Sequence, residues 1–251
     1  MKAIFAFCTV LLVGTSALAV TSKEVSYKSG GETVKAILST PEGSGPFPGI
    51  IVIHEWFGLN DWVKEQASKL TGEGYVTLAI DLYRGKVATS GDEAHELMRG
   101  LAEDRVKRDL VAAFEFLSAQ PSVKQDRIGA IGWCMGGGIA LDLALEEPKL
   151  AADVVNYGHL VTDPAEVKKI HAPILGLFGA EDRGITPADV NKFREEMDKQ
   201  GKKADITIYP DAGHQFENPN NKEAYRPKDA EDAWTKTIAF FDNTLRNRQK
   251  E

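Results

Sequence analysis

Residues 128–138 have the sequence Ile-Gly-Ala-Ile-Gly-Trp-Cys-Met-Gly-Gly-Gly, and this stretch decides the fold that we expect. An apolar run ends in it, and residues 139–145 then read Ile-Ala-Leu-Asp-Leu-Ala-Leu, which is typical of a helix. A buried strand, a sharp turn and a helix form the context of a nucleophile elbow, here with Cys134 where serine is usual. Gly132 and Gly136 fit this interpretation, because a side chain two positions from the strained corner would collide across the turn. The alternative is an ordinary strand-to-helix turn with a small buried cysteine.

The rest of the chain alternates short apolar runs with helical patterns. Residues 25–27 and 33–39 alternate apolar and polar side chains on either side of two glycines, which predicts an antiparallel hairpin at a sheet edge. Continuous apolar runs predict buried strands at 49–54, 75–80, 128–132, 152–157, 173–178 and 205–209. Helical spacing predicts helices at 60–72, 92–101, 104–119, 135–147, 187–200 and 222–246. The pattern indicates one α/β domain, with a mostly parallel sheet of about eight strands, an antiparallel N-terminal edge and helices on both faces.

The first nineteen residues have the pattern of a secretory signal peptide. Lys2 supplies the positive start, residues 3–14 form an apolar core too short to span a bilayer, and Ala17-Leu18-Ala19 matches a cleavage site. We therefore expect a mature domain over residues 20–251, exported to the periplasm or the medium. No membrane association is expected after cleavage.

Cysteine usage and charge narrow the function further. Cys8 leaves with the predicted signal peptide, so Cys134 has no intramolecular disulfide partner, and a lone thiol in an exported protein indicates reactivity. The formal net charge is −7 and the sequence shows no basic patch, so nucleic acid is not an expected partner. No two histidines have metal-ligand spacing, and we expect neither a metal nor a cofactor. We expect a monomer.

Reactive side chains follow the predicted strands, at the sheet edge where ligands of such folds bind. In chain order they include Cys134, an acid and His214, which is the nucleophile–acid–base order of the α/β-hydrolase fold. Asp182 is the preferred acid, because a short Asp after a strand is the usual provider. Glu181 and Asp211 are the alternatives, although Asp211 follows a proline and is typical of a turn.

This order predicts acyl-transfer chemistry. A thiolate attacks a carbonyl carbon, the imidazole carries the proton, and the carboxylate holds the imidazole in the correct tautomer. Met135, which follows the nucleophile, is expected to donate its backbone N–H to the oxyanion. Trp56, in the loop after the third strand, is the expected second donor.

The sequence resembles the dienelactone hydrolases of the α/β-hydrolase superfamily over nearly the whole mature chain. The resemblance rests on motifs at strand ends, namely His54-Glu55-Trp56-Phe57-Gly58-Leu59-Asn60, Asp81-Leu82-Tyr83, Gly132-Trp133-Cys134-Met135-Gly136-Gly137, Phe178-Gly179-Ala180-Glu181-Asp182, Tyr209-Pro210 and Gly213-His214-Gln215-Phe216. It implies a triad of Cys134, His214 and Asp182. It also implies that Glu55 exchanges hydrogen bonds with the thiol, whereas without the resemblance Glu55 would be interpreted as a solvated loop acid.

The sequence departs from this family where the substrate carboxylate is bound. The resemblance implies two arginines, and Arg84, directly after Tyr83, can serve as the first. The second position, four residues beyond His214, holds Asn218. We therefore expect Arg84, Tyr83 and Asn218 to contact the substrate. Loss of one guanidinium removes a charge-assisted contact to a carboxylate, so the departure bears on the substrate rather than on the reaction. Arg226 and Arg183 are candidate replacements, with surface positions as the alternative.

We therefore expect an exported, cofactor-independent hydrolase that cleaves a small carboxylic ester or lactone through a thioacyl-enzyme on Cys134. Asn218 and the export pattern favour an alternative, a broad-specificity carboxylesterase or other acyl hydrolase. A second alternative is a catalytically inactive periplasmic ligand-binding protein with a hydrolase fold.

Overall fold

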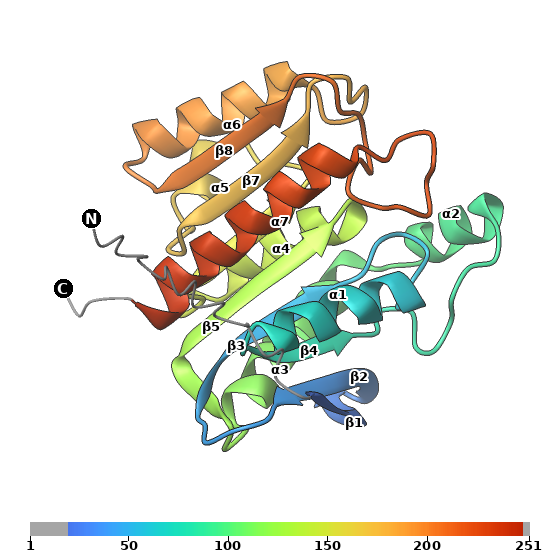
Figure 1. The fold of residues 1–251 in the computed structure, drawn as a ribbon, viewed down its shortest axis with the longest axis vertical. Helices are drawn as coiled ribbons and strands as arrows, with labels where there is room; N and C mark the ends of the chain where they lie inside the picture. Colours follow the sequence, from blue (N-terminus) through green and yellow to red (C-terminus); the bar gives the residue numbers. More distant parts are fainter. Residues whose placement is uncertain (1–19, 248–251) are drawn as a thin grey trace, which may run out of the picture.

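The computed structural model describes residues 20–247 as one mixed sheet of eight strands with helices around it (Figure 1). The predicted signal peptide and Cys8 lie outside the described residues. The strands are β1 (Val20–Ser29), β2 (Glu32–Pro41), β3 (Phe47–Ile53), β4 (Val76–Ile80), β5 (Val123–Trp133), β6 (Ala152–Asn156), β7 (Ile174–Gly179) and β8 (Ala204–Tyr209).

The strand order is β1-β2-β4-β3-β5-β6-β7-β8. The pairs β1–β2 and β2–β4 are antiparallel, and every later pair in the order is parallel. This confirms the predicted sheet with its antiparallel N-terminal edge. The hairpin strands are longer than predicted, because their exposed ends carry polar residues on both faces and lack the alternation on which the prediction relied.

The helices are α1 (Asp61–Gly72), α2 (Gly91–Arg99), α3 (Glu103–Ser118), α4 (Met135–Glu146), α5 (Pro164–Val167), α6 (Pro187–Lys199) and α7 (Pro227–Phe241), which continues as a π-helical segment, η1 (Asp242–Arg246). Figure 1 shows α1 and α7 in front of the sheet and α3 and α4 behind it, whereas α2 lies beyond the carboxyl ends of the central strands. Helices therefore cover both faces, as predicted, and α2 is placed to border a site at the strand ends. None of the helices within residues 20–247 has the length and apolar character that crossing a membrane requires.

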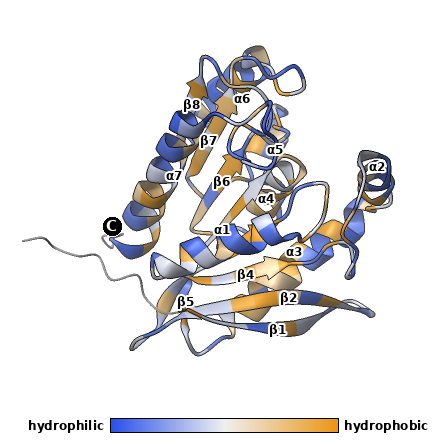
Figure 2. Ribbon diagram, turned by 45° about the vertical axis from the view of Figure 1, so that its right-hand side comes forward, coloured by the Kyte–Doolittle hydropathy of each residue, from blue (hydrophilic) through white to orange (hydrophobic). Residues whose placement is uncertain are grey.

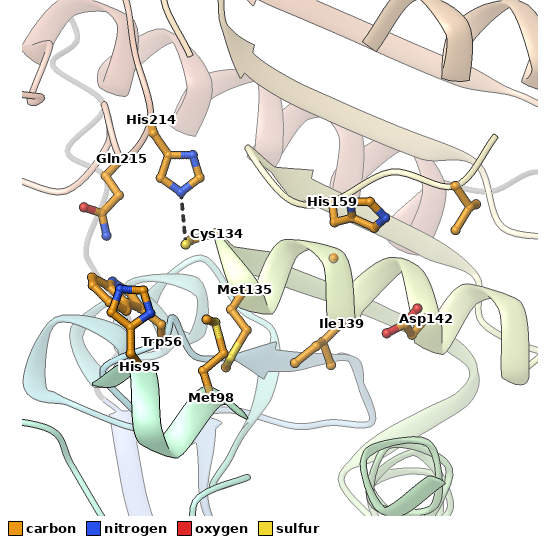
Figure 3. Close-up of a pocket in the computed structure, with 12 residues that line it drawn as sticks. Trp56, His95, Met98, Cys134, Met135, Ile139, Asp142, His159, His214 and Gln215 are labelled. Atoms are coloured by element: carbon orange, nitrogen blue, oxygen red, sulfur yellow. Dashed lines mark hydrogen bonds between the residues drawn. The ribbon is translucent and has the colours of Figure 1, made fainter. Parts of the chain in front are cut away.

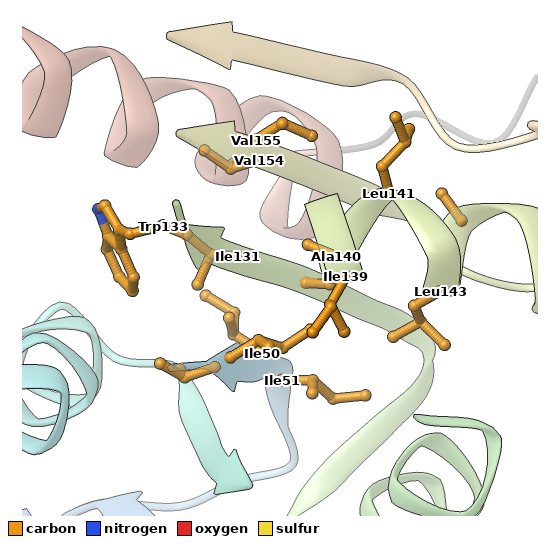
Figure 4. Packing of buried hydrophobic residues seen from close by; sticks show 14 of the residues in the cluster. Ile50, Ile51, Ile131, Trp133, Ile139, Ala140, Leu141, Leu143, Val154 and Val155 are labelled. Carbon is orange, nitrogen blue, oxygen red and sulfur yellow. The ribbon is translucent and has the colours of Figure 1, made fainter. Parts of the chain in front are cut away.

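The core lies where the central strands meet the helices. Residues 50–53 of β3 are fully buried and pack against β5 and α4, and the same core cluster includes Ile131, Ile139 and, on β6, Val154 (Figure 4). Each such side chain contributes about 1.5–3 kcal/mol when it is fully buried. Figure 2 shows hydrophobic residues concentrated in central strands such as β7, with hydrophilic residues on the outer faces of the helices. The core thus fixes the strand ends that carry the reactive residues.

The C-terminal helix is shorter than the predicted range of 222–246. It begins at Pro227, whose missing N–H is tolerated in the first turn of a helix. The preceding residues form a loop that Arg226 ties down, because its backbone N–H donates to Phe216 O and its Nε donates to Asp211 O. The four-residue helix α5 was not predicted, since one turn is too short to show a helical period.

Candidate active site

Cys134 occupies the corner between β5 and α4 in a conformation that few residues adopt. Its φ is 55° and its ψ is −121°, and its backbone N–H donates to Asn156 O at 3.0 Å. A Cβ at Gly132 would collide with the carbonyl oxygen of Gly136 across the turn. A Cβ at Gly136 would lie 2.5 Å from the carbonyl oxygen of Ile53. The structure therefore has the elbow that the sequence predicts, and strain of this kind is found where geometry serves function.

The structure brings Cys134, His214 and Asp182 into one hydrogen-bonded chain. His214 Nε2 lies 3.0 Å from Cys134 Sγ, and His214 Nδ1 lies 2.7 Å from Asp182 Oδ2 (Figure 3 shows the first contact). The other carboxylate oxygen of Asp182 accepts hydrogen bonds from the backbone N–H groups of Gly184 and Ile185. Of the three candidate acids, Asp182 is the one that contacts the histidine. Three separate loops thus present a thiol, an imidazole and a fixed carboxylate in line.

The surroundings of the two residues stabilise the ionised carboxylate of Asp182 and the protonated imidazole of His214. Burial raises the pKa of Asp182, but hydrogen bonds from His214 and from the backbone of Ile185 outweigh it, so the pKa lies below its usual value. Burial lowers the pKa of His214, but the hydrogen bonds with Asp182 and Cys134 outweigh it and raise the pKa to about 10. The ring of Tyr157 packs edge-on against the imidazole at 5.2 Å. The site therefore holds the imidazole in place and stabilises its protonated form.

Glu55 is buried rather than a solvated loop acid, with 1% of its surface exposed. Its carboxylate accepts hydrogen bonds from Asn218 Nδ2 at 3.0 Å and from Gln215 Nε2 at 3.4 Å, while the thiol is bonded to His214. Burial raises the pKa of Glu55 to about 7, because the two amides and the nearby His214 only partly compensate for lost solvation. Glu55 is therefore tied to the loop that carries the histidine.

Glu217 is a partly exposed residue of this region whose carboxyl group is buried, and it was not predicted from the sequence. Trp133 Nε1 donates to its Oε2 at 3.2 Å, and its Oε1 has no partner within residues 20–247. The Tyr157 hydroxyl is likewise buried and without a partner in this part of the chain. Burial, reinforced by the charge of Glu55, raises the pKa of Glu217 to about 8. Nothing in the sequence distinguishes this glutamate from a solvated loop residue.

We predict that Glu217→Gln stabilises the protein more at pH 8 than at pH 5. A carboxyl whose pKa is raised on folding contributes stability that is fully present below its unfolded value, 4.5, and is lost as the pH rises through its folded value, about 8. Gln stays neutral and keeps an oxygen for the Trp133 N–H. The free energy of unfolding of the variant, relative to that of the parent, should increase by about 3 to 4 kcal/mol between these pH values. Urea unfolding of the parent and the variant at both pH values measures this increase. A difference between the two proteins that is equal at pH 5 and pH 8 would contradict the raised pKa of Glu217.

A cavity of about 520 Å³ opens over Cys134, and one face of α4 forms its floor (Figure 3). The floor residues are spaced by three or four positions, as residues on one helix face must be: Met135, Gly138, Ile139 and Asp142. His214 and Gln215 border the cavity at the nucleophile. The remaining walls come from the β3 loop, from α2 and from the loop after β6, and they are formed by Trp56, His95, Met98, His159 and Val161.

Arg84, predicted to bind a substrate carboxylate, does not line this cavity. Its guanidinium donates to Glu32 Oε2 at 2.7 Å and is paired with Asp109 Oδ2 at 2.8 Å, so its hydrogen-bonding capacity is directed at the sheet edge. This corrects the sequence-based assignment. The sequence places Arg84 at a strand end but does not reveal the two acids, distant along the chain, that attract its side chain.

The other predicted substrate contacts also lie behind the cavity wall rather than in it. Tyr83 donates its hydroxyl to Trp56 O at 3.0 Å and contacts Met135 Sδ, so it supports two cavity residues. Asn218 is buried against Glu55. Arg226 holds loop carbonyls, Arg183 is exposed, and neither lines the cavity.

The two predicted oxyanion donors lie at the nucleophile end of the cavity. Trp56 and Met135 both line it. Neither backbone N–H has a hydrogen-bond partner among residues 20–247. The two groups therefore remain available to an oxygen bound beside Cys134. No group of three or more His, Cys, Asp or Glu residues in the described chain is arranged to hold a metal ion.

Comparisons with known proteins agree with this architecture. Residues 34–245 match the model of the dienelactone hydrolase family. A protein of Methylorubrum extorquens named "Putative carboxymethylenebutenolidase" is 32% identical over 243 residues, which cover 91% of this chain and 83% of that protein. Two crystal structures cover 90% of this chain and 99% of their own. One, named "Putative Dienelactone Hydrolase" and from Klebsiella pneumoniae, is 29% identical with a TM-score of 0.82. The other, a dienelactone hydrolase-like promiscuous phosphotriesterase from metagenomic libraries, is 26% identical with a TM-score of 0.84.

Proposed function

The chain belongs to the dienelactone hydrolase family and is an ester or lactone hydrolase, and from this premise we propose that it works through a thioacyl-enzyme on Cys134. The observation that carries the proposal is the continuous contact from Cys134 Sγ through His214 to Asp182, on the floor of a cavity large enough for a small substrate. A thiol activated by an imidazole, which a third group orients, is the arrangement that covalent catalysis requires.

In the proposed reaction the Cys134 thiolate attacks the carbonyl carbon of the bound ester. The carbonyl oxygen becomes an oxyanion and accepts hydrogen bonds from the free N–H groups of Trp56 and Met135. His214, stabilised in its protonated form, donates a proton to the leaving alkoxide as the tetrahedral intermediate collapses to a thioester. Water deprotonated by His214 then attacks the thioester, releases the acid and restores the resting enzyme.

Glu55 has a positioning role in this proposal. It accepts hydrogen bonds from Gln215 and Asn218, one and four residues beyond the catalytic histidine. With a pKa of about 7, it changes charge in the range where the enzyme is assayed, so its ionisation affects the imidazole beside it. The carboxyl group thus couples the loop that carries His214 to the strand end beside the nucleophile.

The decisive comparison is hydrolysis of p-nitrophenyl acetate and of a dienelactone by the same purified preparation. Cleavage of both supports a dienelactone hydrolase-like activity. Cleavage of the simple ester alone supports the broader carboxylesterase, which the absence of arginine from the cavity lining favours. Failure to cleave either compound, by protein shown to be folded, contradicts the proposed function.

We predict that Asp182→Asn lowers kcat for p-nitrophenyl acetate by about 10³-fold with little change in KM. The amide presents an N–H where the carboxylate accepted one, so it favours the wrong imidazole tautomer and no longer stabilises the imidazolium. Asp211→Asn is the matched control, because Asp211 is an exposed acid of the same histidine loop. Steady-state kinetics of both variants measure the effect, and equal losses would show that Asp182 is not the specific partner.

We also propose that the protein is exported and begins at Val20 after cleavage. The support is the signal-peptide pattern of residues 1–19, in which Ala17-Leu18-Ala19 matches a cleavage site. N-terminal sequencing of the protein recovered from its native cell fractions tests this. A mature chain in the periplasm or medium supports the proposal, and a cytoplasmic chain that retains Lys2 contradicts it.

A further inference from the structure

The cavity over Cys134 is lined mainly by apolar side chains and has one acidic residue, Asp142, in its lining. Along its floor Met135, Ile139 and Asp142 lie on one face of α4, and Asp142 is seven residues from Met135, or about 10 Å along the helix. Figure 3 shows Asp142 and His159 at the end of the cavity away from Trp56 and His95. A substrate whose carbonyl is at Cys134 can therefore extend an apolar chain over Ile139 and reach Asp142.

Asp142 is the one acid among the residues that line this cavity, and Lys and Arg are absent from that lining. Its carboxylate makes no hydrogen bond or ion pair with any residue between 20 and 247. The neighbouring cation, Lys107, is held at 3.0 Å by Glu103 and at 3.2 Å by Glu146. A negatively charged substrate group would therefore meet an uncompensated carboxylate, whereas a positively charged one would find an unpaired acceptor.

The burial and the pKa of Asp142 are consistent with a carboxyl group that lacks a partner. Its side chain is half-buried, and burial raises its pKa to about 6. Lys107 and His159 act against this shift, and the carboxylates of Glu103 and Glu146 add to it. From β6, the buried carboxyl group of Asp153 also interacts with Asp142, whose charge adds to the effect of burial in raising the pKa of Asp153 well above its usual value. At neutral pH the Asp142 carboxyl group is ionised at a cost in solvation that a bound cation would offset.

We propose that this cavity selects esters whose apolar chain ends in an ammonium or other hydrogen-bond-donor group, which Asp142 binds, and that it discriminates against substrates carrying a carboxylate there. This inference rests on the proposed hydrolase function and specifies its substrate class. It departs from the carboxylate-binding arginines that the family resemblance implies, since Arg84 is paired with Glu32 and Asp109 outside the cavity.

The test uses three p-nitrophenyl esters of equal chain length, made from octanoic acid, from ω-aminooctanoic acid and from suberic acid as its monoester. The assay is run at about pH 7.5, roughly 1.5 units above the Asp142 pKa of about 6, so that the carboxylate is ionised. The expected order of kcat/KM is amino, then neutral, then carboxylate, with about tenfold between the first two. A second series consists of the acetate esters of ω-aminooctanol, octanol and ω-hydroxyoctanoic acid, which carry the same three end groups on the alcohol side. Their hydrolysis is measured by the release of acid. A carboxylate member equal to or better than its amino counterpart in both series overturns the proposal.

Substitutions at Asp142 connect this order to the carboxylate. Asp142→Asn should reduce the amino-to-neutral ratio from about tenfold to about one, and Asp142→Lys should make the carboxylate ester the better substrate by about tenfold. Glu96→Gln is the matched control, because Glu96 is an exposed acid of α2, next in sequence to the cavity residue His95, that lies outside the cavity lining, and it should keep the parental ratio. An unchanged ratio in Asp142→Asn overturns the proposal even if Asp142→Lys fails to fold.

The pH dependence gives an independent readout. In the parent, the amino-to-neutral ratio of kcat/KM should fall as the pH is lowered through about 6, where Asp142 becomes neutral. The same fall is expected in His159→Gln, in which the imidazole that faces Asp142 is absent. A ratio that does not change with pH overturns the proposal. Loss of hydrolysis of all esters, by contrast, would count against the proposed function and not against the order of preference.

Discussion

Cys134→Ala is expected to lower kcat/KM for p-nitrophenyl acetate by about 10⁵-fold. The substitution removes only Sγ, the atom that lies 3.0 Å from His214 Nε2 and attacks the carbonyl in the proposed reaction. Alanine has the same Cβ as cysteine, so the strained backbone at φ 55° costs the two residues about the same. The folded structure should therefore persist while turnover is lost.

The measurement is the initial rate at matched protein concentration, with circular dichroism and thermal unfolding as checks on the fold. Cys134→Ser is the matched comparison, because it restores a weaker nucleophile at the same position, and its rate should lie between those of the parent and the alanine variant. An alanine variant that retains turnover would exclude a covalent role for Cys134.

Gly132→Val is expected to prevent the protein from folding. Any Cβ at this position collides with the backbone carbonyl of Gly136, and a backbone atom in the elbow cannot move aside as a flexible side chain would. β5 lies at the centre of the sheet, between β3 and β6, so a displacement there disturbs both neighbours. The cost should exceed about 5 kcal/mol, which is comparable with the whole stability of an ordinary domain.

Soluble yield and the thermal unfolding midpoint of purified protein measure this effect. Gly72→Ala is the control, because a Cβ there meets no atom within 4 Å and the residue lies at the end of α1. It should be neutral or slightly stabilising. A soluble Gly132→Val variant that melts at the parental temperature would show that the elbow does not require glycine.

Features set by local sequence were predictable. The apolar run into Gly132, the glycines around Cys134 and the helical spacing that follows all describe one strand-turn-helix unit, and the structure has it. Asp182 and His214 were found because parallel strands deliver their carboxyl ends to one edge, so position along the chain was sufficient to place them. Which candidate acid contacts the imidazole depends on a contact between loops, which Asp182 makes and Glu181 does not.

Features set by contacts between distant residues were not predictable. The long side chain of Arg84 forms ion pairs with Glu32 and Asp109. The sequence around Arg84 does not indicate that these two distant acids are its partners. The burial of Glu217 depends on Trp133, 84 positions away in the sequence. The start of α7 at Pro227 depends on a loop anchored by Arg226, whereas the apolar spacing alone extended the helix to residue 222.

The central claim, a thioacyl intermediate on Cys134, is tested most directly by mass spectrometry of the acid-quenched enzyme. Protein mixed with excess p-nitrophenyl acetate is quenched during the first turnovers and digested, and the peptide that contains residues 128–138 is analysed. We expect one acetyl group on Cys134, which disappears as substrate is exhausted and never forms in Cys134→Ala. Steady hydrolysis with no acetyl group on Cys134 at any time, or with the group on another residue, would contradict it.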